Sequence, residues 1–219
     1  QRAVDLEPTN PQFREYLGEY FHALKRPDDA RRMWEEMIAG DLRTTENLVR
    51  LSEVYRGFDY TEDALRTMAA ACEIDPEFSD RIRFSQMLRD ARLVDNSLTQ
   101  LDLARRLAET PEQRQTVLDE RIKTLLEGGL LAEKTSQMAS ALDTTSGSAD
   151  QWRVLTLYQE AMGLLPEASL SIQKATLLDS DSVAVCTTAG RILEKSGMLA
   201  AASAAHSKLA VLDRRFQTE

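Results

Sequence analysis

The sequence predicts an all-α solenoid, in which short antiparallel helix pairs stack on one another along the chain. Three observations predict this fold. The 219-residue chain repeats a pattern of apolar and small residues about every 34 residues. Each repeat contains two stretches with the apolar spacing of an amphipathic helix. The prolines fall where these stretches begin or end, and none interrupts one: Pro8, Pro11, Pro27, Pro76, Pro111 and Pro166.

The clearest repeat runs from Thr45 to about Phe78. Apolar residues line one face of each of its helices, at Leu48, Leu51 and Tyr55 in the first and at Ala64, Leu65, Met68, Ala71 and Cys72 in the second. Small residues recur at two equivalent positions, where they let the two helix backbones of a pair approach closely. One position holds Gly18, Ser52, Ser85, Thr156 and Gly190, and the other holds Ala30, Ala64, Ser97, Ala168 and Ala202.

The remaining repeats keep this pattern to different degrees. Trp34 and His206 take core positions in the second helices of the first and last repeats. The repeat that starts at about Phe78 is shifted by one residue, and the next keeps only four apolar residues near the expected places, namely Leu118, Ile122, Leu131 and Met138. We therefore divide the chain into residues 1–10, the tail of a preceding repeat, residues 11–146, units one to four with the fourth degenerate, and residues 147–219, units five and six.

Glycine and polar residues predict the turns. Gly163, Gly197 and the pair Gly128–Gly129 suit a tight turn between the helices of a pair. Asp28 or Thr61 can cap a second helix, and Asp181 or Ser182 can cap a first helix. The run Thr144-Thr145-Ser146-Gly147-Ser148 is interpreted as a long polar connection between units, or alternatively as a hinge between two sub-arrays.

On these residues the chain resembles the tetratricopeptide repeat (TPR) family. The unit from Thr45 matches that family nearly everywhere, at Leu48, Leu51, Ser52, Tyr55, Ala64, Met68, Ala71 and Pro76. Two departures are Arg14, which stands where a large apolar residue is usual, and Gln159, which replaces an aromatic. The resemblance implies a right-handed TPR-like superhelix and a non-catalytic scaffold that binds a peptide or protein segment.

In TPR arrays the first helix of each pair lines the concave face, so the resemblance also implies a partner-binding face. Its residues here are Glu15, Tyr16, Glu19, His22, Arg50, Glu53, Arg56, Arg83, Gln86, Arg89, Arg153, Leu157, Thr188 and Arg191. Such a groove accepts an extended peptide or a helix. The alternative is an ordinary solvated face. One TPR subgroup binds acidic chaperone tails, but Glu15 and Glu19 stand at its first Lys and Asn positions, so we exclude that activity.

Composition and motifs argue against other classes of function. The net charge of −9 disfavours nucleic acid and an anionic membrane surface as partners. There is no apolar run near the roughly 18 residues that a membrane-spanning helix needs. Cys72 and Cys186 have no neighbouring Cys or His that would make a zinc or redox motif. Without a catalytic, phosphate-binding or metal motif, the sequence predicts no enzyme activity, no cofactor and no metal.

Two alternative functions stay open. The first is a regulatory or substrate-recruiting repeat region of a larger enzyme. The second is an RNA-binding array of the pentatricopeptide kind, which the acidic charge disfavours.

Because the chain begins at Gln1 without methionine, we interpret it as a fragment of a longer protein. We then expect uncapped terminal repeats and self-association through a face around Leu199, Leu209 and Leu212. The sequence gives no indication of localisation or of the partner's identity.

Overall fold

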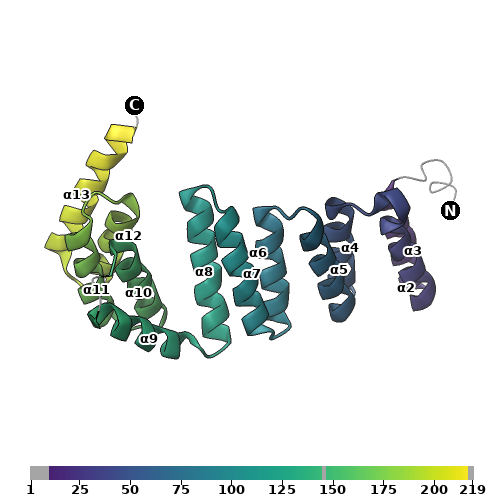
Figure 1. Ribbon diagram of the computed structural model, residues 1–219, viewed down its shortest axis with the longest axis horizontal. Helices are drawn as coiled ribbons and strands as arrows, with labels where there is room; N and C mark the ends of the chain where they lie inside the picture. Colours follow the sequence, from purple (N-terminus) through teal and green to yellow (C-terminus); the bar gives the residue numbers. More distant parts are fainter. Residues whose placement is uncertain (1–9, 145–146, 217–219) are drawn as a thin grey trace. The chain divides into compact units, whose positions relative to one another are not determined.

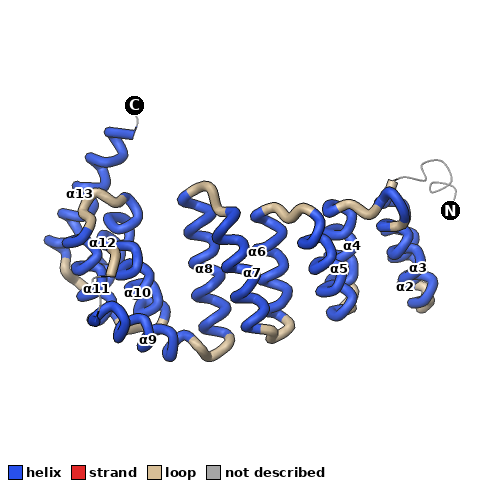
Figure 2. Tube along the Cα trace, in the orientation of Figure 1, coloured by secondary structure: helices blue, strands red, loops and turns tan. Residues whose placement is uncertain are grey.

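The computed structural model describes residues 10–144 and 147–216, and the regular structure in these ranges is helical (Figures 1 and 2). The chain divides into two compact units, Gln1–Thr124 and Leu125–Glu219. The expected tail of a preceding repeat falls outside the described residues, apart from Asn10. The same is true of Thr145 and Ser146 in the run from 144 to 148, so its interpretation as a hinge stays a prediction.

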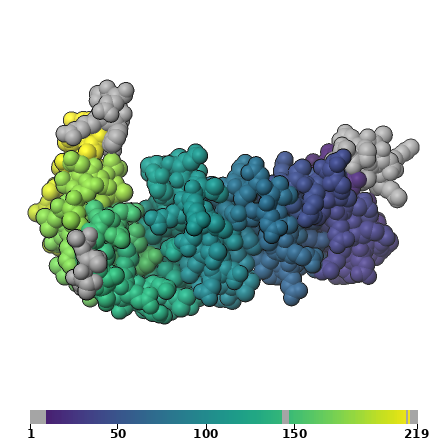
Figure 3. Space-filling view, viewed as in Figure 1, coloured from purple at the N-terminus to yellow at the C-terminus, as the bar shows by residue number. Residues whose placement is uncertain are grey.

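The first unit contains three helix pairs and most of a longer helix. The pairs are α2 (Pro11–Ala23) with α3 (Pro27–Glu35), α4 (Thr45–Gly57) with α5 (Thr61–Ile74), and α6 (Phe78–Asp90) with α7 (Val94–Leu107). Two 3-10 turns, η1 (Glu36–Ile38) and η2 (Gly40–Leu42), follow α3, and α8 (Pro111–Glu127) crosses the boundary between the units. Figures 1 and 3 show the helices of this unit side by side, with the side chains of neighbouring pairs in contact.

The second unit contains two further helix pairs. It begins with the last residues of α8, which are followed by α9 (Leu131–Thr144). The two pairs are α10 (Ala149–Ala161) with α11 (Leu165–Leu178), and α12 (Val183–Lys195) with α13 (Leu199–Phe216). The prediction of consecutive antiparallel helix pairs is therefore confirmed. The first helix of each pair, together with α8, is called an A helix below, and the second helix of each pair is called a B helix.

Six turns between consecutive helices share one geometry. In each, one residue has a positive φ, and the N–H of the next residue donates to the carbonyl five positions back, as in a Schellman motif. These hydrogen bonds are 2.8 to 3.0 Å long, for example from Leu93 to Leu88 and from Arg26 to Phe21. The positive-φ residues are Lys25, Asp59, Arg92, Gly129, Gly163 and Gly197. The glycine turns predicted from the sequence are thus confirmed, and three further turns use other residues.

The length of α8 explains why the fourth unit looked degenerate in the sequence. This helix has 17 residues, whereas α2, α4, α6, α10 and α12 each have 13. The four additional residues make about one helical turn, so the apolar residues of α8 stay on one side of the helix. The residues that follow the insertion no longer fit the spacing of the other repeats. Consequently the positive-φ residues Arg92 and Gly129 are 37 positions apart, whereas the other neighbouring turns are separated by 33 or 34.

The two predicted small-residue positions lie where the helices of a pair meet. A Cβ atom on Gly18 would lie 2.2 Å from Trp34 Nε1, and a Cβ atom on Gly190 would lie 2.5 Å from His206 Cε1. The other residues at the same position, Ser52, Ser85 and Thr156, are fully buried. Small side chains at this position therefore make room for the large core residue of the B helix.

Two of the predicted helix caps are wrong, because the turns already fix where the B helices begin. The N-caps of α3 and α5 are Arg26 and Tyr60, which the Schellman turn positions through their backbone N–H groups. Asp28 and Thr61 therefore lie inside the first turn of their helices. Side-chain caps occur on A helices instead, where Asn10, Thr44, Ser148 and Ser182 each accept from a backbone N–H.

The C-terminal face differs from the sequence prediction. Leu212 is buried, because it lies on the same side of α13 as Ala202 and Ala205, and both of these belong to the core of the second unit. Leu199 is exposed and Leu209 is half-buried, so the predicted exposed face is smaller than expected.

Within the described residues, no helix has the length and apolar character needed to cross a membrane.

Candidate partner-binding face

The candidate residues of the first unit form a polar ladder between successive A helices. Its first step joins α2 to α4, where Glu15 Oε2 accepts from Arg50 Nε at 2.5 Å. The two residues are 35 positions apart, so one helix pair separates them in the sequence. Arg50 is 37% exposed, and its carboxylate partner is more buried. The step therefore holds a half-exposed guanidinium in a fixed place on α4.

The second step joins α4 to α6 through Glu53. One oxygen of this carboxylate lies 3.2 Å from Arg83 Nε, and the other lies 2.6 Å from an Nη atom of Arg56 one helical turn away. Arg83 is 39% exposed and occupies the same repeat position as Arg50. Two successive A helices thus each present a half-exposed arginine that pairs through Nε with a glutamate on the preceding A helix, by a hydrogen bond for Arg50 and by an ion pair for Arg83.

The third step joins α6 to α8 and has the opposite polarity. Glu120 on α8 accepts a hydrogen bond of 2.8 Å from Gln86 Nε2 and a second hydrogen bond from an Nη atom of Arg89. Arg89 is only 5% exposed, and Glu120 is also largely buried. A buried ion pair of this kind is costly to break, because removal of one partner leaves a buried charge uncompensated. This step is therefore a structural joint rather than an open binding surface.

The remaining candidates on α2 have different surroundings. Tyr16 is exposed, and its hydroxyl accepts from Gln12 Nε2 at 3.0 Å. Glu19 is half-buried. His22 lies in an aromatic cluster, with its ring centroid 4.6 Å from that of Phe58 and 6.1 Å from that of Trp34. Only part of the His22 ring is therefore at the surface.

In the second unit the equivalent residues are mostly buried or apolar. Leu157 is buried, and Arg153 is buried against Asp150 of its own helix, with Nη2 and Oδ1 2.8 Å apart. The position of Arg50 and Arg83 is occupied by Val154 and by Thr188. The sequence-predicted face is thus a run of half-exposed charged residues in the first unit only.

One ion-pair cluster does join the A helices of the second unit. Glu160 on α10 accepts from Lys195 Nζ at 2.8 Å and also pairs with Arg191, both on α12. Desolvation raises the pKa of Glu160, but the hydrogen bonds from Lys195 and Arg191 outweigh it, so the pKa is held below its usual value. Arg191, a predicted site residue, is therefore already paired across the A helices.

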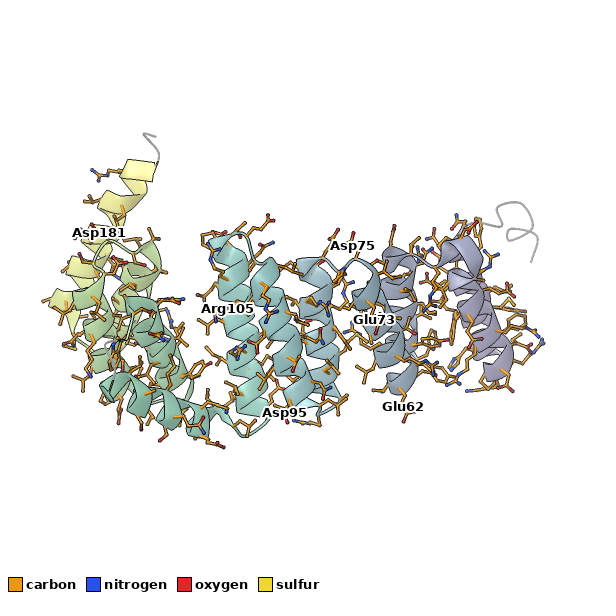
Figure 4. All side chains as sticks on the ribbon, viewed as in Figure 1. Glu62, Glu73, Asp75, Asp95, Arg105 and Asp181 are labelled. Carbon is orange, nitrogen blue, oxygen red and sulfur yellow. The ribbon has the colours of Figure 1, made fainter. Side chains whose placement is uncertain are left out.

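Sequence reasoning missed Glu120, Glu160 and Lys195. A signal for Glu120 was present, since it stands 34 positions after Gln86 and 31 positions after Arg89, whose charge is opposite. The signal for Glu160 was present, since Glu160 and Arg191 stand 31 positions apart with opposite charge. Charged residues of the B helices, such as Glu62 and Glu73 of α5 and Asp95 and Arg105 of α7, lie apart from one another (Figure 4).

The described residues contain no group of three or more His, Cys, Asp or Glu side chains that could hold a metal ion. Burial raises the pKa of the Cys72 thiol to about 11 and also raises that of Cys186. Both thiols are buried and stay protonated at neutral pH, so neither has the character of a reactive nucleophile. Burial likewise raises the pKa of Tyr55 to about 12.

No family model matches the sequence, and no curated protein matches it either. Solved structures of TPR proteins are similar to it over most of its length. YrrB, described as a TPR protein with an unusual peptide-binding site, is 14% identical over 84% of this chain and 94% of its own, with a TM-score of 0.45. PilF of Pseudomonas aeruginosa is 11% identical over 95% and 96%, with a TM-score of 0.45. Cut9, from the APC/C heterotetramer Cut9–Hcn1, is 13% identical over 95% of this chain but only 41% of its own, with a TM-score of 0.45.

Proposed function

We propose that the A-helix face of the first unit binds an extended segment of another protein, without catalysing a reaction. The chain is a TPR-like array of helix pairs, a fold that typically serves protein–protein interaction. The proposal places the binding on α4 and α6, where the polar ladder is half-exposed, rather than on the buried joint to α8. The observation that carries it is that Arg50 and Arg83, at one repeat position, each pair through Nε with a glutamate of the preceding A helix.

This anchoring leaves hydrogen-bond donors at the surface in a fixed arrangement. A guanidinium has five N–H donors; the hydrogen bond to Glu15 uses Nε of Arg50, and the ion pair with Glu53 lies at Nε of Arg83. The Nη groups of Arg50 and Arg83 stay available, since each side chain is more than a third exposed. An arginine that is already held loses less conformational entropy when it binds a partner, which favours binding.

The charges around the two arginines indicate the class of ligand. Glu15 and Glu53 neutralise Arg50 and Arg83, and half-buried Glu19 lies on the adjoining turn of α2. A strongly acidic ligand would therefore meet as much negative as positive charge. Main-chain carbonyls are better acceptors here, because they are polar and uncharged. We expect an extended segment that accepts hydrogen bonds from both arginines, with an apolar side chain against exposed Tyr16.

The experiment is selection of peptides from a random display library on the 219-residue chain, followed by affinity measurement with variants. We expect Arg50→Gln and Arg83→Gln each to weaken the selected peptides by about tenfold, which is about 1.4 kcal/mol. Circular dichroism melts should change little, because exposed ion pairs contribute only about 0–1 kcal/mol to stability.

Arg32→Gln is the matched control, because Arg32 lies on B helix α3, is exposed and is paired with Asp29. It should leave the affinity unchanged. Peptides that bind the double variant Arg50→Gln/Arg83→Gln as well as the unchanged chain would contradict the proposal. So would peptides that lose affinity only with Arg32→Gln.

A further inference from the structure

The outer side of helix α11 carries leucines where the B helices of the first unit carry polar residues. Leu170 is 63% exposed and Leu177 is 88% exposed, and the two lie about two helical turns apart. At the repeat position of Leu170 the first unit has Arg32, Arg66 and Thr99, and at that of Leu177 its helices α5 and α7 have Glu73 and Arg106. Helix α11 therefore exposes apolar surface where the first unit exposes polar surface.

This exposure does not come from a missing neighbour. Helix α11 packs against both α10 and α12, and the hydroxyl oxygen of Ser169 lies 2.6 Å from that of Ser196, the residue that caps the end of α12. The polar counterparts on α5 and α7 are exposed as well, although a further helix follows each of them within the first unit. The outer side of a B helix thus stays open when the array continues, so a further repeat would not cover Leu170 and Leu177.

Two residues of opposite charge flank Leu170 on the same side of α11. Among the residues of this helix only Glu167 and Lys174 are charged. They stand three positions before and four positions after Leu170, and residues at these spacings share a helix face. Both are exposed, and Lys174 Nζ lies 4.1 Å from the ring centroid of Trp152. The outer side of α11 therefore has a negative end, a central leucine and a positive end.

We infer that α11 is the interface of a two-fold symmetric dimer of this chain, in which the Leu170 side chains of the two copies meet. Two helices that cross antiparallel at a small angle contact each other over several turns. With the crossing point at Leu170, residues about equally far before and after it stand opposite each other. Glu167 of each copy then faces Lys174 of the other. Leu177 of each copy faces Leu164, which is half-buried at the start of α11 in the other.

The occupant is a second copy because the charges of this surface are complementary to their own reverse. A partner of a single sign of charge would be repelled by one end of α11. Sparse charge around exposed leucines also matches homodimer interfaces, whose buried surface is more apolar than that of other complexes. A two-fold contact uses the same patch on both copies and closes on itself, so it gives a dimer and not a chain of copies. The inference does not depend on peptide binding, because Arg50 and Arg83 lie on A helices of the first unit.

Sedimentation equilibrium of the 219-residue chain at up to about 1 mM tests the inference through charge reversal. Glu167→Lys and Lys174→Glu each place like charges opposite each other twice in the dimer, and Leu170→Ser removes the central contact. Glu73→Lys is the matched control, because it makes the same change at an exposed outer position of α5. All four residues are exposed, so the variants should fold, and circular dichroism melts check this.

The unchanged chain and the control should form dimers and nothing larger, with a dissociation constant in the micromolar to millimolar range expected of a small interface. Each of the three α11 variants alone should dimerise at least about tenfold more weakly, through facing like charges or the lost leucine contact. An equimolar mixture of Glu167→Lys and Lys174→Glu should regain the dimer, because each carboxylate again faces an ammonium group.

Three results would overturn the inference. The first is an unchanged chain that stays monomeric over the whole concentration range. The second is any α11 variant that dimerises as tightly as the unchanged chain. The third is a mixture of the two charge variants that associates no better than either variant alone, since a two-fold contact at Leu170 requires that the reversed charges match across the two copies.

Discussion

The two compact units close their helix turns with the same hydrogen bonds but with different residues. In the first unit the positive-φ residues of these turns are Lys25, Asp59 and Arg92, with φ between 60° and 63°. In the second they are Gly129, Gly163 and Gly197, with φ between 71° and 76°. The hydrogen bond from the following N–H is present in all six. The turn is therefore defined by its backbone bonding and by the helices packed on either side, and glycine only lowers its strain.

The units also differ in how their A helices are joined. The first has a ladder of ion pairs from α2 to α8, ending in the buried pair of Arg89 and Glu120. The second has one surface cluster around Glu160 and apolar or small residues at the other positions. Residues at equivalent repeat positions can thus form ion pairs between A helices in one unit and pack through apolar or small side chains in the other.

The largest expected difference concerns the core position of the B helices. Trp34→Ala should lower the free energy of unfolding by about 3–5 kcal/mol, because the fully buried indole leaves a cavity. His206→Ala, at the equivalent position in the second unit, should cost less than about 1 kcal/mol, since half of that side chain is already exposed. Urea unfolding of both variants measures this. Equal losses would contradict the difference in burial between these two equivalent positions.

The next effect compares the polar joints. Glu120→Ala removes the carboxylate that faces buried Arg89 and should cost about 3 kcal/mol. Glu160→Ala loosens half-exposed Arg191 and Lys195 and should cost about 1 kcal/mol or less. Thermal melts at low and moderate salt separate the two, because only the surface cluster should weaken with salt. A Glu120 variant as stable as the unchanged chain would refute the role of the joint.

The turns give a smaller effect of opposite sign in the two units. Arg92→Gly should raise the free energy of unfolding by about 0.5–1 kcal/mol, because it removes left-handed strain. Gly163→Ala should lower it by about 1 kcal/mol. A Cβ atom on Gly163 would meet nothing within 4 Å, so a loss there reports backbone strain and not a clash. Destabilisation by Arg92→Gly would show that the arginine side chain holds its turn.

The smallest effect is the acid sensitivity of the second unit. The pKa of Glu160 is lowered in the folded chain, so its contribution to stability is present above the usual value of 4.5 and is lost as pH falls through the folded pKa. Below 4.5 the unchanged chain should therefore lose stability faster than Glu160→Gln. Melting temperatures of both across this range check the slope. Parallel curves would mean that the cluster does not stabilise the fold.

Much of the fold could be predicted from the sequence, because the same pattern of apolar and small residues recurs in several repeats. Buried Trp34, Ala64 and Leu51, and the small residues beside them, follow from periodicity alone. The extra turn in α8 could not be placed in the same way, because an insertion of about one helical turn keeps the apolar face while it shifts the register. The non-glycine turns at Lys25, Asp59 and Arg92 carried no sequence signal either.

The candidate site was predictable as a set of positions but not as a set of partners. Arg50 and Arg83 were identified as A-helix residues, and the structure adds that Glu15 and Glu53 hold them. His22 and Arg153 were predicted from the same repeat, yet His22 is half-buried beside Phe58 and Trp34, and Arg153 is buried against Asp150 of its own helix. Periodicity assigns a residue to a helix face, but how much of the face stays open depends on contacts between helices.

The most direct test of the account is nuclear magnetic resonance of the arginine Nε–Hε groups while a selected peptide is added to the labelled chain. The account predicts that Arg50 and Arg83 shift together with the same dissociation constant. Arg66 on α5 and Arg105 on α7, both exposed residues of B helices, should not move. Shifts confined to Arg66 or Arg105, with Arg50 and Arg83 unchanged at saturation, would contradict the assignment of the binding face to α4 and α6.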